Sequence, residues 1–424
     1  MKMEIRVLLA TLACLPTLAL AQSVRVASWN LGWHVSAAEV PNWIEKCSRS
    51  FKRNPSTKRW DIAPPDAPGS TVGWFIKESR AKLEGVDLTV MPPCGVYQAN
   101  FKGLAVTQEA YANRGRQLTT LLNTAVRPDV IAFQEVSGVA AVQEALGAQA
   151  DQYHVCSFDG EYKVQRLAFA WRKQFGEAAE KCQPVKDVSL PGEPLEGQVR
   201  PAFTVGLRIG GKLIRFMTLH LKSSCVSSLE KDVLDDPNAS DCVTLQMQIR
   251  PLEAAVEALP KGADHFVVFG DFNRNLWHEL NQVPGSEPIR SDQEKSLTKA
   301  MAPGVLSRNL FKEVFDGDPG GAVTLLPLTC SQNPAHQALC DASKKRALDR
   351  KTEVPVLATA SALGCRNPIG LDHFVISGSL QPKVKAAEKL PIGKLGGSKA
   401  PTEGKPQPLL AVSDHCPIVL TLDL

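Results

Sequence analysis

The chain has 424 residues, of which 44% are hydrophobic and 22% are charged, and its formal net charge at pH 7 is +4. This composition allows a substantial core and excludes a wholly disordered chain. The small net charge gives no general electrostatic reason for a polyanionic partner, so any such reason depends on local clusters of basic residues.

The N-terminus predicts export. Lys2 and Arg6 form a basic start, a short apolar core follows, and the sequence Ala-Leu-Ala precedes Gln22, which is typical of a signal peptide and its cleavage site. The apolar core is too short and wrongly flanked for a membrane-spanning helix. We therefore expect a signal peptide over residues 1–21 and a mature chain, 22–424, that is periplasmic or secreted and not inserted in a membrane.

The cysteine content agrees with export. One of the 11 cysteines, Cys14, lies in the predicted signal peptide, and the even number that remains suits disulfide bonds in an oxidising compartment. The mature chain has no Cys-x-x-Cys pair, which argues against a zinc ribbon. Three pairs are close enough in sequence to form disulfides that close local loops, namely Cys47 with Cys94, Cys156 with Cys182 and Cys225 with Cys242. Four cysteines have no assigned partner, namely Cys330, Cys340, Cys365 and Cys416.

Short apolar runs predict strands along the whole mature chain. They cover residues 24–30, 128–136, 166–172, 200–209, 212–224, 265–275, 370–378 and the C-terminal segment 412–424. Apolar residues at helical spacing predict intervening helices over 107–126, 137–149 and 243–259, with Pro251 expected to kink or restart the last one. Three of the strands follow one another without a helix. This pattern predicts mixed sheets with outer helices rather than a purely parallel sheet.

Three stretches are predicted to be insertions into one domain, since the chain shows neither an internal repeat nor a linker between two cores. Residues 41–105 are rich in Pro, Gly, Lys and Arg, and 317–368 in Pro, Cys and basic residues. Residues 379–410 are rich in Lys, Pro and Gly and are expected to form a long loop.

Polar side chains at the strand ends form a set that suits phosphate chemistry. An α/β scaffold presents the polar groups at its strand ends to a shared cleft. Carboxylate and amide oxygens suit a hard divalent cation such as Mg²⁺, and imidazoles backed by carboxylates suit acid–base catalysis near neutral pH. The members of the set are Asn30, Glu135, His220, Asp271, Asn273, Asp372, Asp414 and His415.

Each of these residues also allows a structural interpretation when it is taken alone. Asn30 could cap or turn a strand, and His220 lies between two leucines like a core histidine. Glu135 interrupts an apolar run, where an unpaired carboxylate would be costly, so a cationic partner is favoured. Asp271 and Asn273 would point to the same side of an extended chain after a glycine, although a turn is the alternative.

The ordered set resembles the endonuclease/exonuclease/phosphatase superfamily of metal-dependent phosphodiesterases, which includes secreted deoxyribonucleases. The resemblance rests on ASWNLG, IAFQEV, RPAF, TLHLKS, VFGDFN, GLDHFVIS and VSDHCPIVL and spans Val24 to Leu422. It implies a four-layer α/β/β/α sandwich of two mixed β-sheets flanked by helices. It also implies in-line attack of water on a phosphoester with Mg²⁺ as the cofactor, or Mn²⁺ or Ca²⁺ in its place.

The resemblance also implies a role for each matching residue. Asn30, Glu135 and Asp414 would form the metal site, with Glu135 a direct ligand. Asp271 and Asn273 would position the attacking water and hold the scissile phosphate.

Four further residues complete the implied site. His415 would contact the phosphate and move protons, and Asp372 would orient it and support its charged form. His220 would be the second active-site histidine. Arg200, in RPAF, would lie near the phosphate.

Local basicity favours a nucleic-acid substrate. Residues 46–60 carry six basic residues with Phe51 and Trp60 between them, a pattern typical of phosphate contacts combined with base stacking. Residues 343–351 and 379–410 add further basic charge, and the insertions 41–105 and 379–410 should lie near the rim of the cleft. A solvated, disulfide-tethered loop is the alternative interpretation of 46–60.

We therefore expect a monomeric, exported nuclease that hydrolyses DNA and possibly RNA with little sequence preference. The same chemistry would serve a sphingomyelinase-like enzyme or a small-molecule phosphatase, but the loops are basic and Pro-rich rather than apolar, which counts against a lipid substrate. A catalytically inactive binding module is disfavoured, because all expected metal and imidazole positions are present.

Overall fold

In the computed structural model of the chain, the first described residue is Gln22. The described residues are 22–78, 81–100, 102–158, 165–194, 197–223, 239–280, 309–317, 321–330, 333–344, 363–365 and 370–424. Several predictions fall outside them: the signal peptide over 1–21, the pairing of Cys225 with Cys242, and almost all of the basic stretch 343–351.

The first of two large sheets is mixed. Its central strand β1 pairs in parallel with β5 and antiparallel with β15. In spatial order the six strands are β14 (Val384–Lys389), β15 (Ile418–Asp423), β1 (Ser23–His34), β5 (Val130–Val136), β7 (Arg166–Arg172) and β6 (Tyr153–Ser157).

The second sheet is also mixed and six-stranded. The parallel pair β10 and β11 lies at its centre, and β9 and β13 flank this pair in antiparallel orientation. In spatial order the strands are β12 (Val323–Leu325), β13 (Asp372–Ser377), β11 (His265–Asp271), β10 (Lys212–His220), β9 (Ala202–Ile209) and β8 (Glu180–Val185).

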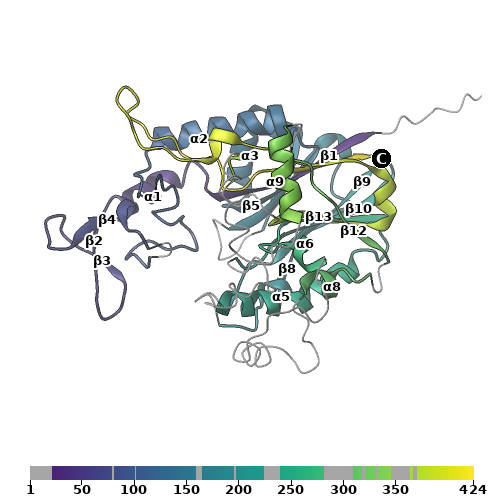
Figure 1. Cartoon of the computed structure of the whole chain (residues 1–424), viewed down its shortest axis with the longest axis horizontal. Helices are drawn as coiled ribbons and strands as arrows, with labels where there is room; N and C mark the ends of the chain where they lie inside the picture. Colours follow the sequence, from purple (N-terminus) through teal and green to yellow (C-terminus); the bar gives the residue numbers. More distant parts are fainter. Residues whose placement is uncertain are drawn as a thin grey trace, which may run out of the picture.

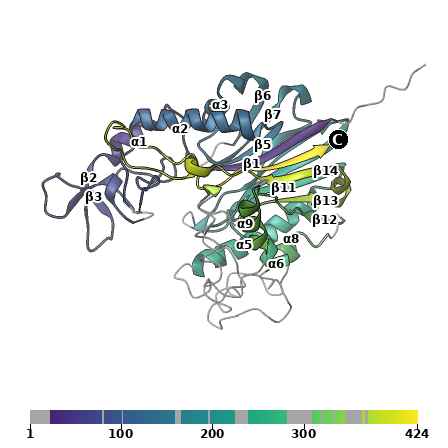
Figure 2. The same cartoon turned by 45° about the horizontal axis from the view of Figure 1, so that its top comes forward.

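The two sheets pack face to face between outer helices, which Figures 1 and 2 show from two directions. Phe169 of the first sheet and Phe203, Phe216 and Phe269 of the second are fully buried in one cluster between the sheets. Outside, α2 (Gln108–Leu121) and α3 (Val139–Leu146) pack on the first sheet, and α5 (Ala239–Ala258), α6 (Leu276–Leu280) and α8 (Leu310–Val314) pack on the second. The four-layer α/β/β/α sandwich is therefore confirmed.

The helices follow the predicted apolar patterns, with one difference. The Thr107 side chain caps α2 by accepting a hydrogen bond from the backbone of Ala110, an interaction that satisfies an otherwise unpaired helix donor. Helix α5 continues through Pro251 instead of restarting there. Leu245, Ile249, Leu252 and Val256 are buried in its contact with the second sheet, and this burial outweighs the loss of one backbone hydrogen bond.

Residues 41–105 form a lobe with its own core rather than a bare loop. The lobe contains α1 (Val40–Cys47) and a small sheet in which β2 (Ser50–Arg53) lies between β3 (Trp60–Ile62) and β4 (Ser70–Val72). Its hydrophobic cluster includes Trp43, Trp74 and Tyr97, and Leu410 from the third insertion joins it. In Figure 1 the lobe projects on the left, away from the sheets.

The other two predicted insertions each supply an edge strand, which corrects the expectation of a long loop over 379–410. Val384–Lys389 forms β14 and Val323–Leu325 forms β12. Val323–Leu325 has only three residues, and Val384–Lys389 mixes charged residues with alanines, so neither carries an alternation long enough to identify a strand in sequence. The rest of the third insertion runs along α2 towards the lobe (Figures 1 and 2), where Gln407 accepts a hydrogen bond from Thr107.

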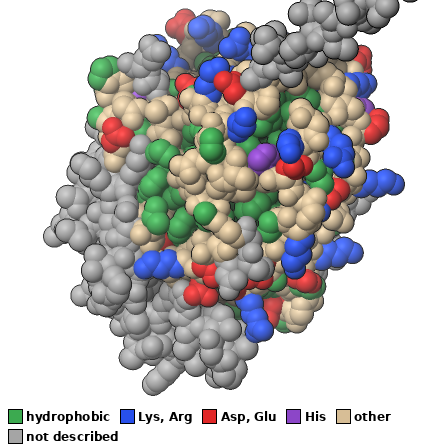
Figure 3. All heavy atoms as spheres, turned by 90° about the vertical axis from the view of Figure 1, so that its right-hand side faces the viewer, with side chains coloured by type: hydrophobic (Ala, Val, Ile, Leu, Met, Phe, Trp, Pro, Cys, Tyr) green, Lys and Arg blue, Asp and Glu red, His purple; other side chains and the backbone are tan. Residues whose placement is uncertain are grey.

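Four disulfide bonds join described cysteines. Cys47–Cys94 and Cys156–Cys182 confirm two predicted pairs, and the cysteines without an assigned partner form Cys330–Cys340 and Cys365–Cys416. Among the described residues, no helix has the length and apolarity needed to cross a membrane. The face in Figure 3 carries basic side chains interspersed with acidic ones, so positive charge does not dominate there.

Candidate active site

Strand register brings the predicted site residues to one edge of the sandwich. In the second sheet, His220 lies opposite Asp271, and Asp271 lies opposite Asp372. In the first sheet, Asn30 pairs with Gln134, the residue before Glu135. Residues scattered over most of the chain therefore meet where the strands of the two sheets end.

The carboxylate of Asp271 is the centre of the site. Its Oδ2 accepts a hydrogen bond from Asn30 Nδ2 at 3.0 Å, which joins the two sheets. The same oxygen lies 3.6 Å from His220 Nε2 and 3.7 Å from His415 Nε2. Its Oδ1 accepts from the backbone of Asn273 at 2.8 Å. A single buried carboxylate thus faces both histidines and an amide.

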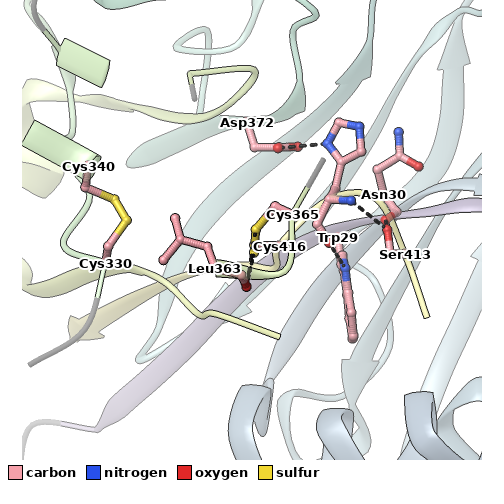
Figure 4. The surroundings of a disulfide bond; sticks show 10 residues. Trp29, Asn30, Cys330, Cys340, Leu363, Cys365, Asp372, Ser413 and Cys416 are labelled. Atoms are coloured by element: carbon pink, nitrogen blue, oxygen red, sulfur yellow. Dashed lines mark hydrogen bonds and ion pairs between the residues drawn. A yellow bond between two sulfur atoms is a disulfide. The ribbon is translucent and has the colours of Figure 1, made fainter. Parts of the chain in front are cut away.

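His415 is fixed by its neighbours on three sides. Asp372 Oδ2 lies 2.9 Å from His415 Nδ1, as predicted for an orienting carboxylate. The His415 backbone oxygen accepts from Trp29 Nε1, and its backbone nitrogen donates to Ser413. The next residue forms the Cys365–Cys416 disulfide, which Figure 4 shows beside the loop held by Trp29 and Ser413. Such support gives the imidazole a fixed position at the site.

The two histidines have opposite protonation tendencies. Burial lowers the pKa of His220 well below its usual value, and the charges of Arg200 and His415 add to this effect. Burial alone would also lower the pKa of His415, but Asp372 and Asp271 outweigh it and hold that pKa well above its usual value. The site thus offers one charged and one neutral imidazole. Burial raises the pKa of Asp271 to about 6, so this carboxyl group loses its proton closer to neutral pH than an ordinary aspartate does.

Glu135 and Asp414 fit a divalent cation. Burial and, next, the neighbouring Asp414 carboxylate raise the pKa of Glu135 to about 7, and a bound cation would reverse this effect. Both side chains line the same cavity, and Glu135 Oε2 accepts from the backbone of Trp33 at 3.0 Å. Asn30 presents its amide nitrogen here: Nδ2 donates to Glu135 Oε1 at 3.4 Å, while Asn30 Oδ1 accepts from the backbone of Gly32 at 2.9 Å. The two carboxylates, rather than Asn30, match the preference of Mg²⁺ for oxygen ligands.

A second group could also hold a cation. Asp271, Asp372 and His415 offer ligand atoms within 4.8 Å of one another, and all three are buried. The hydrogen bond between His415 and Asp372 occupies two of these groups, which favours a proton-transfer cluster. The oxygen ligands of Glu135 and Asp414, which face the cavity, are the better site for a hydrated ion.

Arg200 and Asn273 lie at the site but interact mainly with the protein backbone. Arg200 lines the cavity, and its nitrogens donate to the backbone oxygens of His220 and Leu221 and to the Gln165 side chain. Asn273 Nδ2 donates to the Leu221 oxygen at 3.0 Å. The role of these two residues in phosphate binding stays a prediction.

A cavity of about 490 Å³ opens over the site. Glu135, Arg200, His220 and Asp414 line it, while Asp271 and His415 are almost fully buried. Sequence analysis missed the part of the lining that comes from irregular segments of two insertions, which have no recognisable pattern. These residues are Pro93, Gly95, Val96, Tyr97, Gln98 and Asn100 from the first insertion and Gly396, Gly397 and Ser398 from the third. The expectation that the insertions lie at the cleft rim is correct for these two segments.

The basic stretch 46–60 is less available for nucleic acid than expected. Lys46 and Arg49 pair with Glu45, and Arg53 pairs with Glu78. Phe51, a predicted stacking group, is fully buried in the core of the lobe because it anchors β2. Trp60 packs against the same cluster. Three exposed cations remain in this stretch, namely Lys52, Lys58 and Arg59.

The sequence matches the family model described as Endonuclease/Exonuclease/phosphatase family over residues 98–415. Similar solved structures include D. rerio TDP2 complexed with single strand DNA product, at 12% identity, with 95% of this chain and 99% of that chain covered and a TM-score of 0.40. They also include a Bacteroides thetaiotaomicron mannosyl-6-phosphatase (13% identity, 94% and 98% covered, TM-score 0.41) and a Neisseria meningitidis 3'-5' exonuclease (16% identity, 73% and 95% covered, TM-score 0.38). No curated protein sequence matches the chain. Because the family match covers well over half of the sequence, the chain belongs to the Endonuclease/Exonuclease/phosphatase family.

Proposed function

We propose that this protein is an exported, Mg²⁺-dependent phosphodiesterase that hydrolyses DNA and acts as a monomer. Members of its family hydrolyse phosphoester bonds and generally depend on a divalent metal. The observation that carries the proposal is the position of Asp271, whose Oδ2 lies within 3.7 Å of two imidazoles of opposite protonation tendency, behind a cavity with two more carboxylates. Four disulfides among the described residues support export.

The geometry suits in-line hydrolysis of a phosphoester. In its ionised form Asp271 accepts a proton from the attacking water, and the Asn30 hydrogen bond holds this carboxylate in place. The imidazolium of His415 stabilises the charge on the phosphate. The bond from phosphorus to the leaving oxygen breaks as the water oxygen bonds to phosphorus, and the His415 imidazolium gives its proton to the leaving oxygen.

The metal site would lie beside this cluster. Glu135 and Asp414 would hold the ion, with Asn30 next to them. When bound, Mg²⁺ supplies charge neutralisation at the phosphate oxygens. The raised pKa of Glu135 supports this assignment, because a cation is the partner that the two crowded carboxylates require.

A small phosphoester is the second candidate substrate. Among the residues that the structure describes, the cavity lining contains one guanidinium, that of Arg200, and no lysine, whereas a groove for a nucleic-acid backbone is usually lined by several cations. The exposed Lys52, Lys58 and Arg59 of the lobe support a nucleic acid instead. Both candidates use the same catalytic residues, so they differ in the substrate rather than in the chemistry.

The test compares substrates and variants. Purified protein is incubated with plasmid DNA, single-stranded DNA, RNA, sphingomyelin and 4-nitrophenyl phosphate, with Mg²⁺ or with a chelator. We expect Mg²⁺-dependent cleavage of DNA that is lost in Glu135→Ala and His415→Ala. Intact nucleic acid with Mg²⁺, Mn²⁺ and Ca²⁺ would refute a nuclease, and full activity of both variants would refute the site.

A further inference from the structure

The active-site cavity contains a buried tyrosine hydroxyl without a hydrogen-bond partner among the described residues. Tyr97 lines the cavity together with Glu135 and Asp414, and this residue is only 4% exposed. A buried hydroxyl without a partner destabilises the folded state. Its position therefore calls for a partner that enters the cavity from outside.

Packing, and not hydrogen bonding, fixes the Tyr97 ring. The edge of Trp43 meets it with ring centroids 6.3 Å apart, and the Arg114 guanidinium lies 5.2 Å from its centroid. Three residues earlier, Cys94 is tied to Cys47 of α1 by a disulfide. The lobe thus holds the ring in one place, and no described residue accepts a hydrogen bond from its hydroxyl.

Tyr111 shows what a purely structural tyrosine looks like in the same cluster. Its ring also faces the Arg114 guanidinium, at 5.5 Å. Its hydroxyl, unlike that of Tyr97, contacts His34 Nδ1 at 3.1 Å and donates to the Val35 backbone oxygen at 2.9 Å. The two tyrosines share their surroundings and differ in whether the protein satisfies the hydroxyl.

The cavity chemistry identifies the missing partner as an acceptor. Burial raises the pKa of Tyr97, so its hydroxyl keeps its proton and can donate. The substrate phosphate is rich in acceptor oxygens. Arg200 directs hydrogen bonds to the backbone of His220 and Leu221, so the Tyr97 hydroxyl would add a donor on the side of the cavity formed by the first insertion.

We infer that the Tyr97 hydroxyl donates a hydrogen bond to a non-bridging oxygen of the substrate phosphate. This makes Tyr97 a substrate-binding residue supplied by the first insertion. The inference rests on the proposed phosphoester chemistry of the cavity and adds to it a residue outside the strand-end set.

The test is Tyr97→Phe, which keeps the ring and removes only the oxygen. The measurements are kcat/KM for bis(4-nitrophenyl) phosphate, inhibition by inorganic phosphate, and Tm with and without inorganic phosphate. We expect kcat/KM to fall about tenfold or more, the phosphate Ki to rise, and Tm without phosphate to stay equal or increase. Tyr111→Phe is the matched control, with a lower Tm and unchanged kcat/KM.

Wild-type kinetics and phosphate affinity in Tyr97→Phe, within about twofold, would overturn the inference whatever happens to Tm. Failure of the proposed function has a different signature. In that case the wild type hydrolyses none of the substrates, and the rise in Tm caused by inorganic phosphate still reports whether Tyr97 contacts the anion. An equal rise in wild type and Tyr97→Phe would then refute the contact.

Discussion

Asp372→Asn isolates the charge that supports His415. The change keeps the shape of the side chain and its ability to accept from His415 Nδ1, which lies 2.9 Å away. It removes the negative charge that, with Asp271, holds the pKa of His415 well above its usual value against the effect of burial. We expect the pKa of His415 to fall and the fraction of imidazolium at neutral pH to fall with it.

The expected loss follows from the burial of the pair. A hydrogen bond to a charged partner contributes about 1.5–3 kcal/mol, and one between neutral groups about 0.5–1.5 kcal/mol. The variant therefore loses about 1–2 kcal/mol of stabilisation of the imidazolium, which corresponds to a fall in kcat/KM of about five- to thirtyfold. Both side chains are buried, so salt should screen the effect little.

The pH dependence gives a second readout. A histidine whose pKa is raised on folding stabilises the folded state fully below its unfolded pKa, and this contribution is lost as pH rises through the folded pKa. Asp372→Asn should therefore cost more stability at about pH 6 than at about pH 9. Its kcat/KM should also decline at lower pH than that of the wild type.

The control and the refuting result are clear. Asp264→Asn removes a surface carboxylate that pairs with Lys212 at 3.0 Å, an exposed ion pair that contributes little to stability, and should leave kcat/KM unchanged. Wild-type kcat/KM with an unshifted pH profile in Asp372→Asn would refute the role given to this pair. A large loss of Mg²⁺ affinity in the same variant would assign Asp372 to a metal site instead.

Three other predictions concern the metal site and stability. Glu135→Gln should raise the Tm measured in chelator, because burial and repulsion by Asp414 disfavour the Glu135 carboxylate. The same variant should need an Mg²⁺ concentration about tenfold or more higher for half-maximal activity. A lower Tm with unchanged Mg²⁺ dependence would contradict this prediction. Gly270→Ala should lower the free energy of unfolding by at least about 1–3 kcal/mol, because Gly270 has a φ of +131° and an added Cβ would lie 2.4 Å from the Leu219 backbone oxygen. Chemical denaturation measures the loss, and an unchanged midpoint would refute the close contact. Burial lowers the pKa of His373 to about 4. Its contribution to folding stability is therefore complete above about pH 6.5 and falls by about 3 kcal/mol as the pH drops towards 4. Denaturation at both pH values tests this, and a His373→Gln variant with the same pH dependence of stability as the wild type would refute it.

The fold, and the meeting of the polar strand-end residues at one edge of it, were predictable because they depend on short periodic segments. The strands that end at His220 and Asp271 alternate or run apolar up to a polar terminus, and parallel pairing of such strands forces these termini together. Asp372 follows from the same logic on an antiparallel neighbour. A polar residue at the end of a strand can be identified from the sequence, because the point where the apolar run stops marks the end of the strand.

Other features escaped prediction for physical reasons. The edge strand Val384–Lys389 has no hydrophobic alternation, and it is held by pairing with β15 rather than by its own pattern. Phe51, which sequence analysis considered for base stacking, is buried because the lobe needs a core of its own. Burial within an irregular insertion depends on contacts between segments that are distant in sequence, and local composition does not report them.

The cavity is lined by two kinds of segment, and we expect the strand ends to determine the reaction and the insertions to determine the substrate. The floor, with Glu135 and His220, comes from the ends of sheet strands, whereas the walls come from residues 93–100 of the first insertion and 396–398 of the third. These two insertions also pack together, since Leu410 joins the hydrophobic cluster of the lobe. A substitution in one insertion should therefore also affect the other. We expect substitutions in either insertion to change KM and substrate preference more than kcat.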